Sequence, residues 1–346
     1  MKALHIKTAC AAIVGVALAL SAIPSADAET NLRFNRWLPP SHFLQKIVID
    51  GWMNDVAKVT EGRVKPQITA AGVGGPKRQY QVVADGIVDV GWIAHGYTPG
   101  EFPLTEFVEL PFLGDSGEAI SVAYWNTYNK YLLPAKEHRA THLVTLHTHT
   151  PGHVYNKKRA IKTIADFKGL KIRANNRTTT KFLKSVGASP LFMSVTTMGD
   201  GLAKGVLDGT VFTDEAFVNF RIQKQVKYAL KFPGGLYNTS FATVMNKDAW
   251  KKISAQDRAA ISKISGAAFA RKAGREWDRQ ERMGEKTLAG IGVQTTRLEG
   301  KFLELIRAKV SGFEKDWIKA ADAKGFDGSA ILRHFRKEIA DYQEKM

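Results

Sequence analysis

Two stretches of the chain alternate between strand-like and helix-like segments, and this rhythm constrains the fold more than any other feature. In the first stretch, residues 31–37, 63–69 and 88–94 have strand-like patterns, and residues 42–60 and 76–84 have helical spacing. Strands that alternate with helices in this way predict an open α/β sheet.

A second stretch of the same kind begins near residue 153. Its expected strands are residues 153–156, 170–173, 191–194 and 210–212, its expected helices are residues 178–186 and 197–206, and a return strand is expected over residues 236–246. At roughly 150 residues per domain, a chain of 346 residues is expected to form two domains.

The segment from residue 254 to 289 is rich in helix-forming residues. As one helix it would be about 54 Å long, so it would have to lie along two domains. Gly266, Gly274 and Gly284 are expected to bend or break it. Residues 303–344 follow as two or three amphipathic helices.

The N-terminus has the features of a secretory signal peptide. Two lysines precede an Ala-rich apolar stretch at residues 9–23, and the small residues at 26–28 predict cleavage before Glu29. Residues 1–28 are therefore assigned to a signal peptide. The alternative, a retained membrane anchor, is disfavoured because the apolar stretch is short and no basic stop-transfer flank follows it. The only cysteine, Cys10, lies before cleavage, and export without disulfides favours a bacterial periplasm.

The chain is strongly basic, with a formal net charge of +17 that becomes +16 after residues 1–28 are removed. Such a charge attracts anions, so nucleic acid, an anionic membrane surface or a small anion are the possible partners. The basic residues are spread along the chain, and no nucleic-acid-binding motif accompanies them. No nucleic-acid partner is therefore expected.

Arg173 is the strongest candidate for contact with an anion. It ends an expected strand just before a helix that starts near Thr178. Ligands of open α/β sheets lie beyond the carboxyl ends of the strands, and the free N–H groups of a helix start favour an anion there. A guanidinium could hold a carboxylate at two points. A surface arginine paired with a neighbouring Asp or Glu is the alternative, and position alone leaves the two open.

Around Arg173 and in several other blocks, the chain resembles the substrate-binding proteins of TRAP (tripartite ATP-independent periplasmic) transporters, of the organic-acid or dicarboxylate receptor type. Six blocks carry the resemblance, and their spacing and order match across most of residues 31–300. The blocks are residues 86–91 (GIVDVG), 96–97 (GY), 109–113 (ELPFL), 164–173 (IADFKGLKIR), 186–190 (VGASP) and 205–209 (GVLDG).

The resemblance implies an α/β fold of two lobes, joined by hinge strands and by a long helix that spans both. Lobe 1 would comprise residues 29–150, with about 245–285 returning to it. Lobe 2 would comprise residues 151–244, with C-terminal helices over about 286–346 packing across the lobes. The protein would be a receptor and not an enzyme, would need no cofactor, and would act as a monomer in the periplasm, delivering a small organic acid to the membrane subunits of the transporter.

The resemblance also implies particular ligand contacts. The family's carboxylate-binding arginine falls on Arg173, and a second arginine falls on Arg159. Many members read Asp-Gly-Gln-Glu-Asn-Pro where this chain has DGTVFT at residues 208–213, so Phe212 replaces the usual Asn. An aromatic wall beside the carboxylate would suit a less polar acid than a sugar acid. Asn175, two residues after Arg173, is included in the expected site.

Five further candidates follow from their positions at strand ends. Trp37 and His42 come after the first expected strand, and Trp92, His95 and Tyr97 lie at the third. Each lies where a cleft would open. For the two tryptophans, core packing is an equally good interpretation.

Four histidines between residues 142 and 153 suggest an alternative function. His142, His147, His149 and His153 could belong to a secreted metal-dependent hydrolase, because zinc sites use clustered imidazoles. However, no His-Glu-x-x-His pattern occurs and no cysteine ligand would survive export. We therefore expect no metal, and we place His149, just before the expected crossover between lobes, among the ligand contacts.

Overall fold

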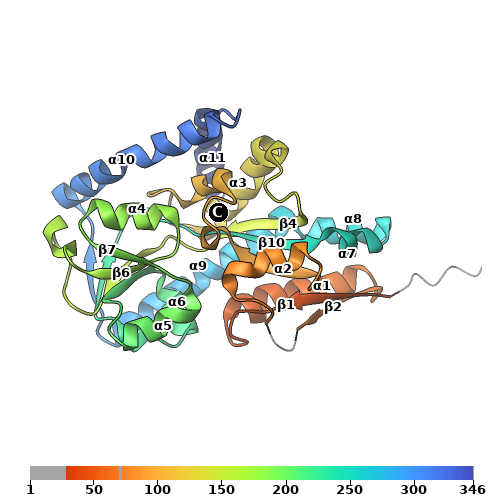
Figure 1. Cartoon of the computed structure of the whole chain (residues 1–346), viewed down its shortest axis with the longest axis horizontal. Coiled ribbons are helices and arrows are strands. Elements are labelled where there is room, and N and C mark those ends of the chain that lie inside the picture. The colour runs from red at the N-terminus through yellow and green to blue at the C-terminus, as the bar shows by residue number, and fades with distance from the viewer. Residues whose placement is uncertain (1–28, 70–71, 346) are drawn as a thin grey trace, which may run out of the picture.

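The computed structural model describes residues 29–69 and 72–345, and the signal peptide predicted over residues 1–28 lies outside this part of the chain. The described residues form two separate β-sheets with helices around them (Figure 1). The predicted two-lobe α/β fold is confirmed.

The first sheet contains five strands in the order β2-β1-β3-β10-β4. β1 is parallel to β2 and β3, whereas β10 is antiparallel to both β3 and β4. β10 therefore returns to a sheet that the earlier strands began, as expected for a crossing segment. The strands are β1 (Thr30–Asn35), β2 (Val64–Ile68), β3 (Val90–Ala94), β4 (Thr141–Thr148) and β10 (Ser240–Asn246).

The second sheet contains six strands in the order β11-β9-β5-β8-β6-β7. β6 is parallel to β7 and β8, and β5 is antiparallel to β8 and β9. Two of its members, β9 and β11, were not expected from the sequence. The strands are β5 (His153–Asn156), β6 (Lys171–Ala174), β7 (Ser189–Phe192), β8 (Gly209–Phe212), β9 (Tyr228–Lys231) and β11 (Gln294–Arg297).

Helices cover both sheets, and the last two lie along one edge of the molecule (Figure 1). α10 contacts α4 near the second sheet, and it also contacts α11, which packs on α3. The helices are α1 (Asp50–Val59), α2 (Gln79–Ala84), α3 (Gly117–Thr127), α4 (Arg177–Ser185), α5 (Val195–Ala203), α6 (Asp214–Asn219), α7 (Lys247–Lys252), α8 (Ala255–Ile264), α9 (Gly266–Gly290), α10 (Gly300–Asp322) and α11 (Gly328–Gln343).

The long helix predicted over residues 254–289 is broken at Gly266. This glycine has a φ of +54°, a left-handed conformation that ends α8 and starts α9 in a new direction. A Cβ atom here would lie 2.7 Å from the Trp125 ring, so the position also requires close packing. α9 alone has 25 residues, or about 37 Å, rather than the 54 Å of an unbroken helix.

α9 connects the two sheets by close backbone contact at two glycines. It contacts the helix α3, and it contacts β4 of the first sheet. Further along it contacts α6, which follows β8 of the second sheet (Figure 1). A Cβ atom on Gly274 would lie 2.5 Å from Cα of Glu118, and one on Gly284 would lie 2.4 Å from N of Glu215. The helix continues through both glycines, in contrast to the expected bend or break. The role of each glycine is instead to let another helix pack closely against α9.

Two carboxylates of α9 cap the helices that it touches. Asp278 accepts hydrogen bonds from the backbone N–H groups of Gly117 (2.7 Å) and Glu118 (3.1 Å) at the start of α3. Glu281 accepts hydrogen bonds from the N–H groups of Asp214 and Glu215, both at 3.0 Å, at the start of α6. Each carboxyl group accepts hydrogen bonds from N–H groups that have no partner within their own helix, so each contact fixes one helix to α9.

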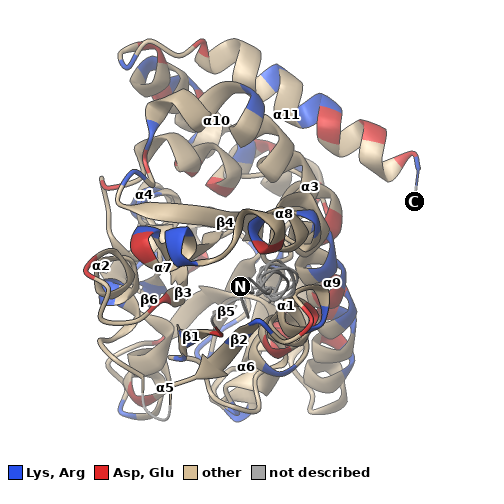
Figure 2. Cartoon of the chain, turned by 90° about the vertical axis from the view of Figure 1, so that its right-hand side faces the viewer, with Lys and Arg blue, Asp and Glu red and all other residues tan. Residues whose placement is uncertain are grey.

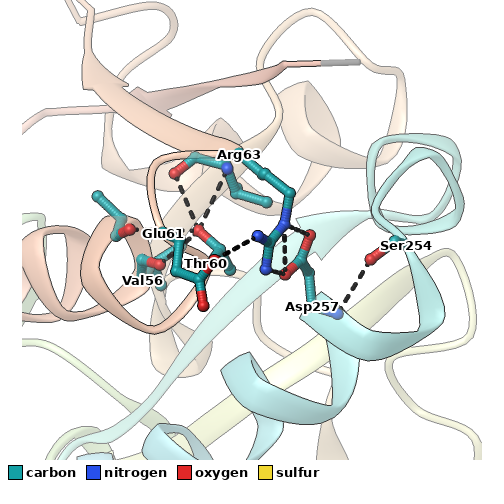
Figure 3. A network of polar contacts seen from close by, with 8 residues as sticks. Val56, Thr60, Glu61, Arg63, Ser254 and Asp257 are labelled. Atoms are coloured by element: carbon teal, nitrogen blue, oxygen red, sulfur yellow. Dashed lines mark hydrogen bonds and ion pairs between the residues drawn. The ribbon is translucent and has the colours of Figure 1, made fainter. Parts of the chain in front are cut away.

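An ion pair connects α8, which follows β10, to the residue just before β2 (Figure 3). The guanidinium of Arg63, before β2, binds Asp257 of α8 with Nη2–Oδ1 at 2.8 Å and Nε–Oδ2 at 3.1 Å. The N–H of Asp257 in turn donates to Oγ of Ser254. The Asp257 carboxylate holds the pKa of Arg63 above its ordinary value.

The division of the chain into lobes remains a prediction. We propose one refinement of its boundaries: the end of lobe 2 at residue 244 moves to about residue 239, because β10 pairs with β4 from Ser240 to Asn246 and with β3 from Phe241 to Met245.

Basic and acidic residues occur on many of the described elements. Figure 2 shows Lys and Arg on most of the helices in view, with Asp and Glu between them. The basic residues are thus spread along the chain, as the sequence indicates. No helix among the described residues is both long enough and apolar enough to span a membrane.

The packing of α9 on α6 predicts that Gly284→Ala destabilises the protein by about 1–3 kcal/mol, because the added methyl group meets backbone atoms that have no room to move. Gly290→Ala is the matched control: it lies on the same helix, and its Cβ would meet nothing within 4 Å. The free energy of unfolding in urea measures both. Equal stability of the two variants would contradict the proposed close contact.

Candidate ligand-binding site

A cavity is lined by residues of both sheets, of the segments that follow their strands and of α9. Eight of the ten residues predicted from the sequence line it: Trp37, His42, Trp92, Tyr97, His149, Arg173, Asn175 and Phe212.

Arg173 is a buried cation at the end of β6, with only 1% of its surface exposed. Its Nε donates to the carbonyl of Met193 (3.0 Å) and its Nη1 to the carbonyl of Val211 (3.3 Å). Within residues 29–69 and 72–345, no Asp or Glu forms an ion pair with it. A buried charge is costly unless it is paired, so this guanidinium favours an anion in the cavity.

Tyr97 links Arg173 to the opposite side of the cavity. Its hydroxyl oxygen accepts hydrogen bonds from Nη2 of Arg173 (3.2 Å) and from the N–H of Val195 (3.1 Å). Both contacts use the oxygen as acceptor, so the hydroxyl proton remains to be donated. Tyr97 is thereby placed to donate to an anion that Arg173 binds.

A short hydrogen-bond chain fixes the amide of Asn175. Nδ1 of His149 lies against the carbonyl of Thr150 and must therefore donate, which leaves Nε2 of the neutral ring as an acceptor. The hydroxyl of Thr239 donates to this Nε2 at 2.8 Å and accepts from Nδ2 of Asn175 at 2.8 Å. The amide of Asn175 is thus oriented as a donor, and burial keeps His149 neutral by lowering its pKa to about 4.

Aromatic rings form most of the cavity wall. Trp37 stacks on Trp92 with ring centroids 5.0 Å apart and an angle of 17°, and Phe241 stacks on Trp277 at 5.4 Å and 6°. The face of Phe212 lies 5.7 Å from the guanidinium carbon of Arg173. Such walls contribute large apolar area and allow a planar ring to stack.

One carboxylate also lines the cavity. Glu215, at the start of α6, accepts hydrogen bonds from Nε1 of Trp277 (3.0 Å), Oγ1 of Thr213 (2.9 Å) and Nδ2 of Asn219 (2.9 Å). Burial is the largest influence on this group and raises its pKa to about 7. The sequence analysis did not identify Glu215.

Two predicted ligand contacts are not at the cavity. Arg159 is exposed, and its guanidinium donates to the carbonyls of Asp166 (3.0 Å) and Lys168 (2.7 Å) within its own loop. His95 bonds instead to Ser240 (2.7 Å) and His138 (2.8 Å) behind the cavity wall. Both residues are therefore removed from the candidate site.

The four histidines of residues 142–153 do not converge on one point. His142 stacks on Trp250 at 3.8 Å, Nε2 of His147 accepts from Nε1 of Trp92 (2.9 Å), and Nδ1 of His153 accepts from a backbone N–H (3.2 Å). In the part of the chain that the structure describes, no group of three His, Cys, Asp or Glu side chains is placed to hold a metal ion.

The sequence analysis missed several residues that complete the cavity. Thr239 and Phe241 lie around the start of β10, in the segment expected to return between lobes, and that crossing was the signal that could have identified them. Trp277 lies on α9 between Glu276 and Asp278, and this local sequence gives no signal that its ring reaches a cavity. The other missed residues are Leu38, Val195, Thr213, Glu215, Ala216, Phe220 and Tyr237.

From the burial and hydrogen bonds of His149, we predict that its ring stays neutral, with the proton on Nδ1, down to a pH of about 4. The unfolded chain binds this proton near the ordinary pKa of 6.5, so the contribution of His149 to stability falls as the pH drops from 6.5 towards 4. A titration followed by ¹⁵N NMR of the histidine rings measures this directly. Protonation of His149 near pH 6.5 would contradict the hydrogen-bond chain.

Comparison with known proteins identifies the fold. A family model described as bacterial extracellular solute-binding protein, family 7 (DctP), matches residues 34–319. A TRAP periplasmic solute-binding protein from Bordetella bronchiseptica, solved with bound (R)- and (S)-mandelate, is 38% identical, with a TM-score of 0.88 and coverage of 90% of this chain and 99% of that chain.

Two other solved structures agree. A TRAP solute-binding protein from a marine metagenome, described as specific for aromatic acid ligands and solved with 3-hydroxybenzoate, is 33% identical, with a TM-score of 0.85 and coverage of 91% and 99%. One from Rhodoferax ferrireducens, in complex with copurified benzoate, is 29% identical, with a TM-score of 0.84 and coverage of 91% and 98%.

These comparisons confirm the resemblance found in the sequence. The family and its solved members are solute receptors, so the prediction that the chain is not an enzyme is confirmed, and the alternative of a metal-dependent hydrolase is wrong. The chain belongs to family 7 of the bacterial extracellular solute-binding proteins, the solute receptors of TRAP transporters.

Proposed function

We propose that this receptor binds an aromatic monocarboxylate, with the carboxylate on Arg173 and the ring between the aromatic walls. The observation that carries the proposal is the buried guanidinium of Arg173, which has no carboxylate partner in the described chain and lines the cavity. A ligand carboxylate would supply the missing charge and form charge-assisted hydrogen bonds.

The remaining polar groups around Arg173 match one carboxylate. The free hydroxyl proton of Tyr97 and the second amide hydrogen of Asn175 are donors at the same cavity. Beyond them the wall is formed by rings such as Trp37, Trp92 and Phe212. A ligand with many hydroxyls would lose its water there without gaining enough partners, which disfavours sugar acids.

The ligands of the related proteins support this assignment. The three solved structures compared above contain mandelate, 3-hydroxybenzoate and benzoate, each of which joins one carboxylate to an aromatic ring. The aromatic lining of this cavity makes the same class of ligand suitable here.

We further propose that ligand binding favours a closed form, which the membrane subunits of the transporter recognise. Tyr97 follows β3 of the first sheet and Arg173 ends β6 of the second, so a carboxylate between them contacts both sheets. A ligand shifts a conformational equilibrium only through such differential contacts. The receptor would act as a monomer in the periplasm.

The anchoring role of Arg173 is tested with a matched pair of arginine variants. Arg173→Ala is expected to weaken benzoate or mandelate binding by about 2–5 kcal/mol, because it removes one partner of a desolvated charge pair. Arg159→Ala is expected to leave the affinity unchanged, because Arg159 is exposed and bonds only within its loop. Isothermal titration calorimetry measures both, and circular dichroism checks that both fold. Equal effects of the two substitutions would contradict the assignment.

The ligand class is tested by mass spectrometry of the small molecule carried through native purification. We expect the mass of an aromatic monocarboxylic acid, and a rise in melting temperature on adding benzoate but not glucuronate. Recovery of a polyhydroxy acid would refute the proposed ligand class.

A further inference from the structure

We propose that Glu215 makes the cavity prefer aromatic monocarboxylates that carry a hydroxyl group on or near the ring, and makes it reject aromatic dicarboxylates. This inference rests on the proposed function, because it takes Arg173 as the anchor of the ligand carboxylate. Glu215 is 3% exposed and lines the same cavity as Arg173. An anionic wall group favours a hydrogen-bond donor on the ligand and repels a second anion.

The protein holds Glu215 as an acceptor with one position free. Its Oε1 accepts from both Thr213 (2.9 Å) and Trp277 (3.0 Å), and its Oε2 accepts from Asn219 (2.9 Å). Oδ1 of Asn219 is itself occupied by the N–H of Phe43 at 3.3 Å, which fixes the direction of the Asn219 amide. A carboxylate has about four acceptor positions, so one remains for a donor from the ligand.

His42 supplies a donor to the same cavity. The N–H of Leu44 donates to Nδ1 of His42 at 3.2 Å, and burial lowers the pKa of this ring to about 3, so the neutral ring carries its proton on Nε2. This N–H has no hydrogen-bond partner among the described residues, and His42 lines the cavity. His42 and Glu215 are connected through the Phe43–Asn219 hydrogen bond.

A hydroxyl group is the ligand substituent that suits this pair. It can donate to Glu215 and accept from His42, whereas a second carboxylate can only accept. A second carboxylate would also place two negative charges together in a site of low polarity, which is strongly unfavourable. The cavity is thus polarised, with a cation at Arg173 and an acceptor at Glu215.

The test is calorimetric titration of the full-length mature chain with benzoate, 3- and 4-hydroxybenzoate, isophthalate and terephthalate. A pH of about 8 keeps Glu215 ionised, because its pKa is about 7. We expect the better hydroxybenzoate to bind at least ~10-fold tighter than benzoate, and at least ~100-fold tighter than either dicarboxylate.

Glu215→Gln should remove this discrimination. The new amide keeps its oxygen towards Thr213 and Trp277, so its NH₂ group replaces Oε2 and the free acceptor is lost. Nδ2 of Asn219 loses the same acceptor and keeps its hydrogen bond to the backbone carbonyl of residue 215. Both affinity ratios should shrink by about tenfold. Glu109→Gln is the matched control, because Glu109 is equally buried (2% exposed), accepts from the N–H of Ser240 and does not line this cavity. It should keep both ratios.

Two results would overturn the inference while leaving the proposed function intact. The first is benzoate binding that depends on Arg173 without any preference for a hydroxyl over a hydrogen or a carboxylate in the unmodified protein. The second is unchanged ratios in a folded Glu215→Gln variant. Since the first uses the unmodified protein, failure of the variant to fold does not protect the inference. Failure of every aromatic acid to bind would contradict the proposed function and this inference together.

Discussion

The buried guanidinium of Arg173 is the interaction on which the site depends. The protein surrounds it with backbone carbonyls, the hydroxyl of Tyr97 and the face of Phe212, which offer partial negative charge but no full counter-charge. Water is largely excluded, since only 1% of the residue is exposed. The structure therefore stabilises the cation partly and leaves the remaining stabilisation to an anion from outside. In the proposed complex, loss of the ligand carboxylate would leave this buried charge unpaired, which would favour acids over neutral ligands.

α9 joins the architecture of the molecule to the chemistry of this site. Its Asp278 caps α3, beside the first sheet, and its Glu281 caps α6, beside the second sheet. One rigid helix therefore sets the distance between the parts of the molecule that are built on the two sheets. Trp277 directly precedes Asp278 on the same helix, and its ring forms part of the cavity wall while its N–H donates to Glu215. A shift of either sheet relative to α9 would therefore alter the cavity, which is the coupling that a closing receptor needs.

The sequence predicted most of the fold and most of the residues that it placed at the candidate cavity, because both depend on local patterns. The strand–helix rhythm defined most strands of the two sheets, and strand-end position identified Arg173. The failures came from side-chain direction and from contacts distant in sequence. Arg159 satisfies its donors within its own loop, and His95 lies in a tight turn after β3 that directs it towards His138 while Tyr97 enters the cavity. Trp277 reaches the cavity only through the packing of α9, which no local pattern records.

The central claim is tested most directly by a crystal structure of the receptor with 3-hydroxybenzoate at a resolution that distinguishes the two ends of the ligand. The account predicts that both carboxylate oxygens lie within hydrogen-bond distance of Arg173, with Tyr97 and Asn175 as further donors, and that the ring lies against Phe212. A ligand whose carboxylate lies elsewhere in the cavity, with Arg173 bonded only to protein atoms, would contradict it.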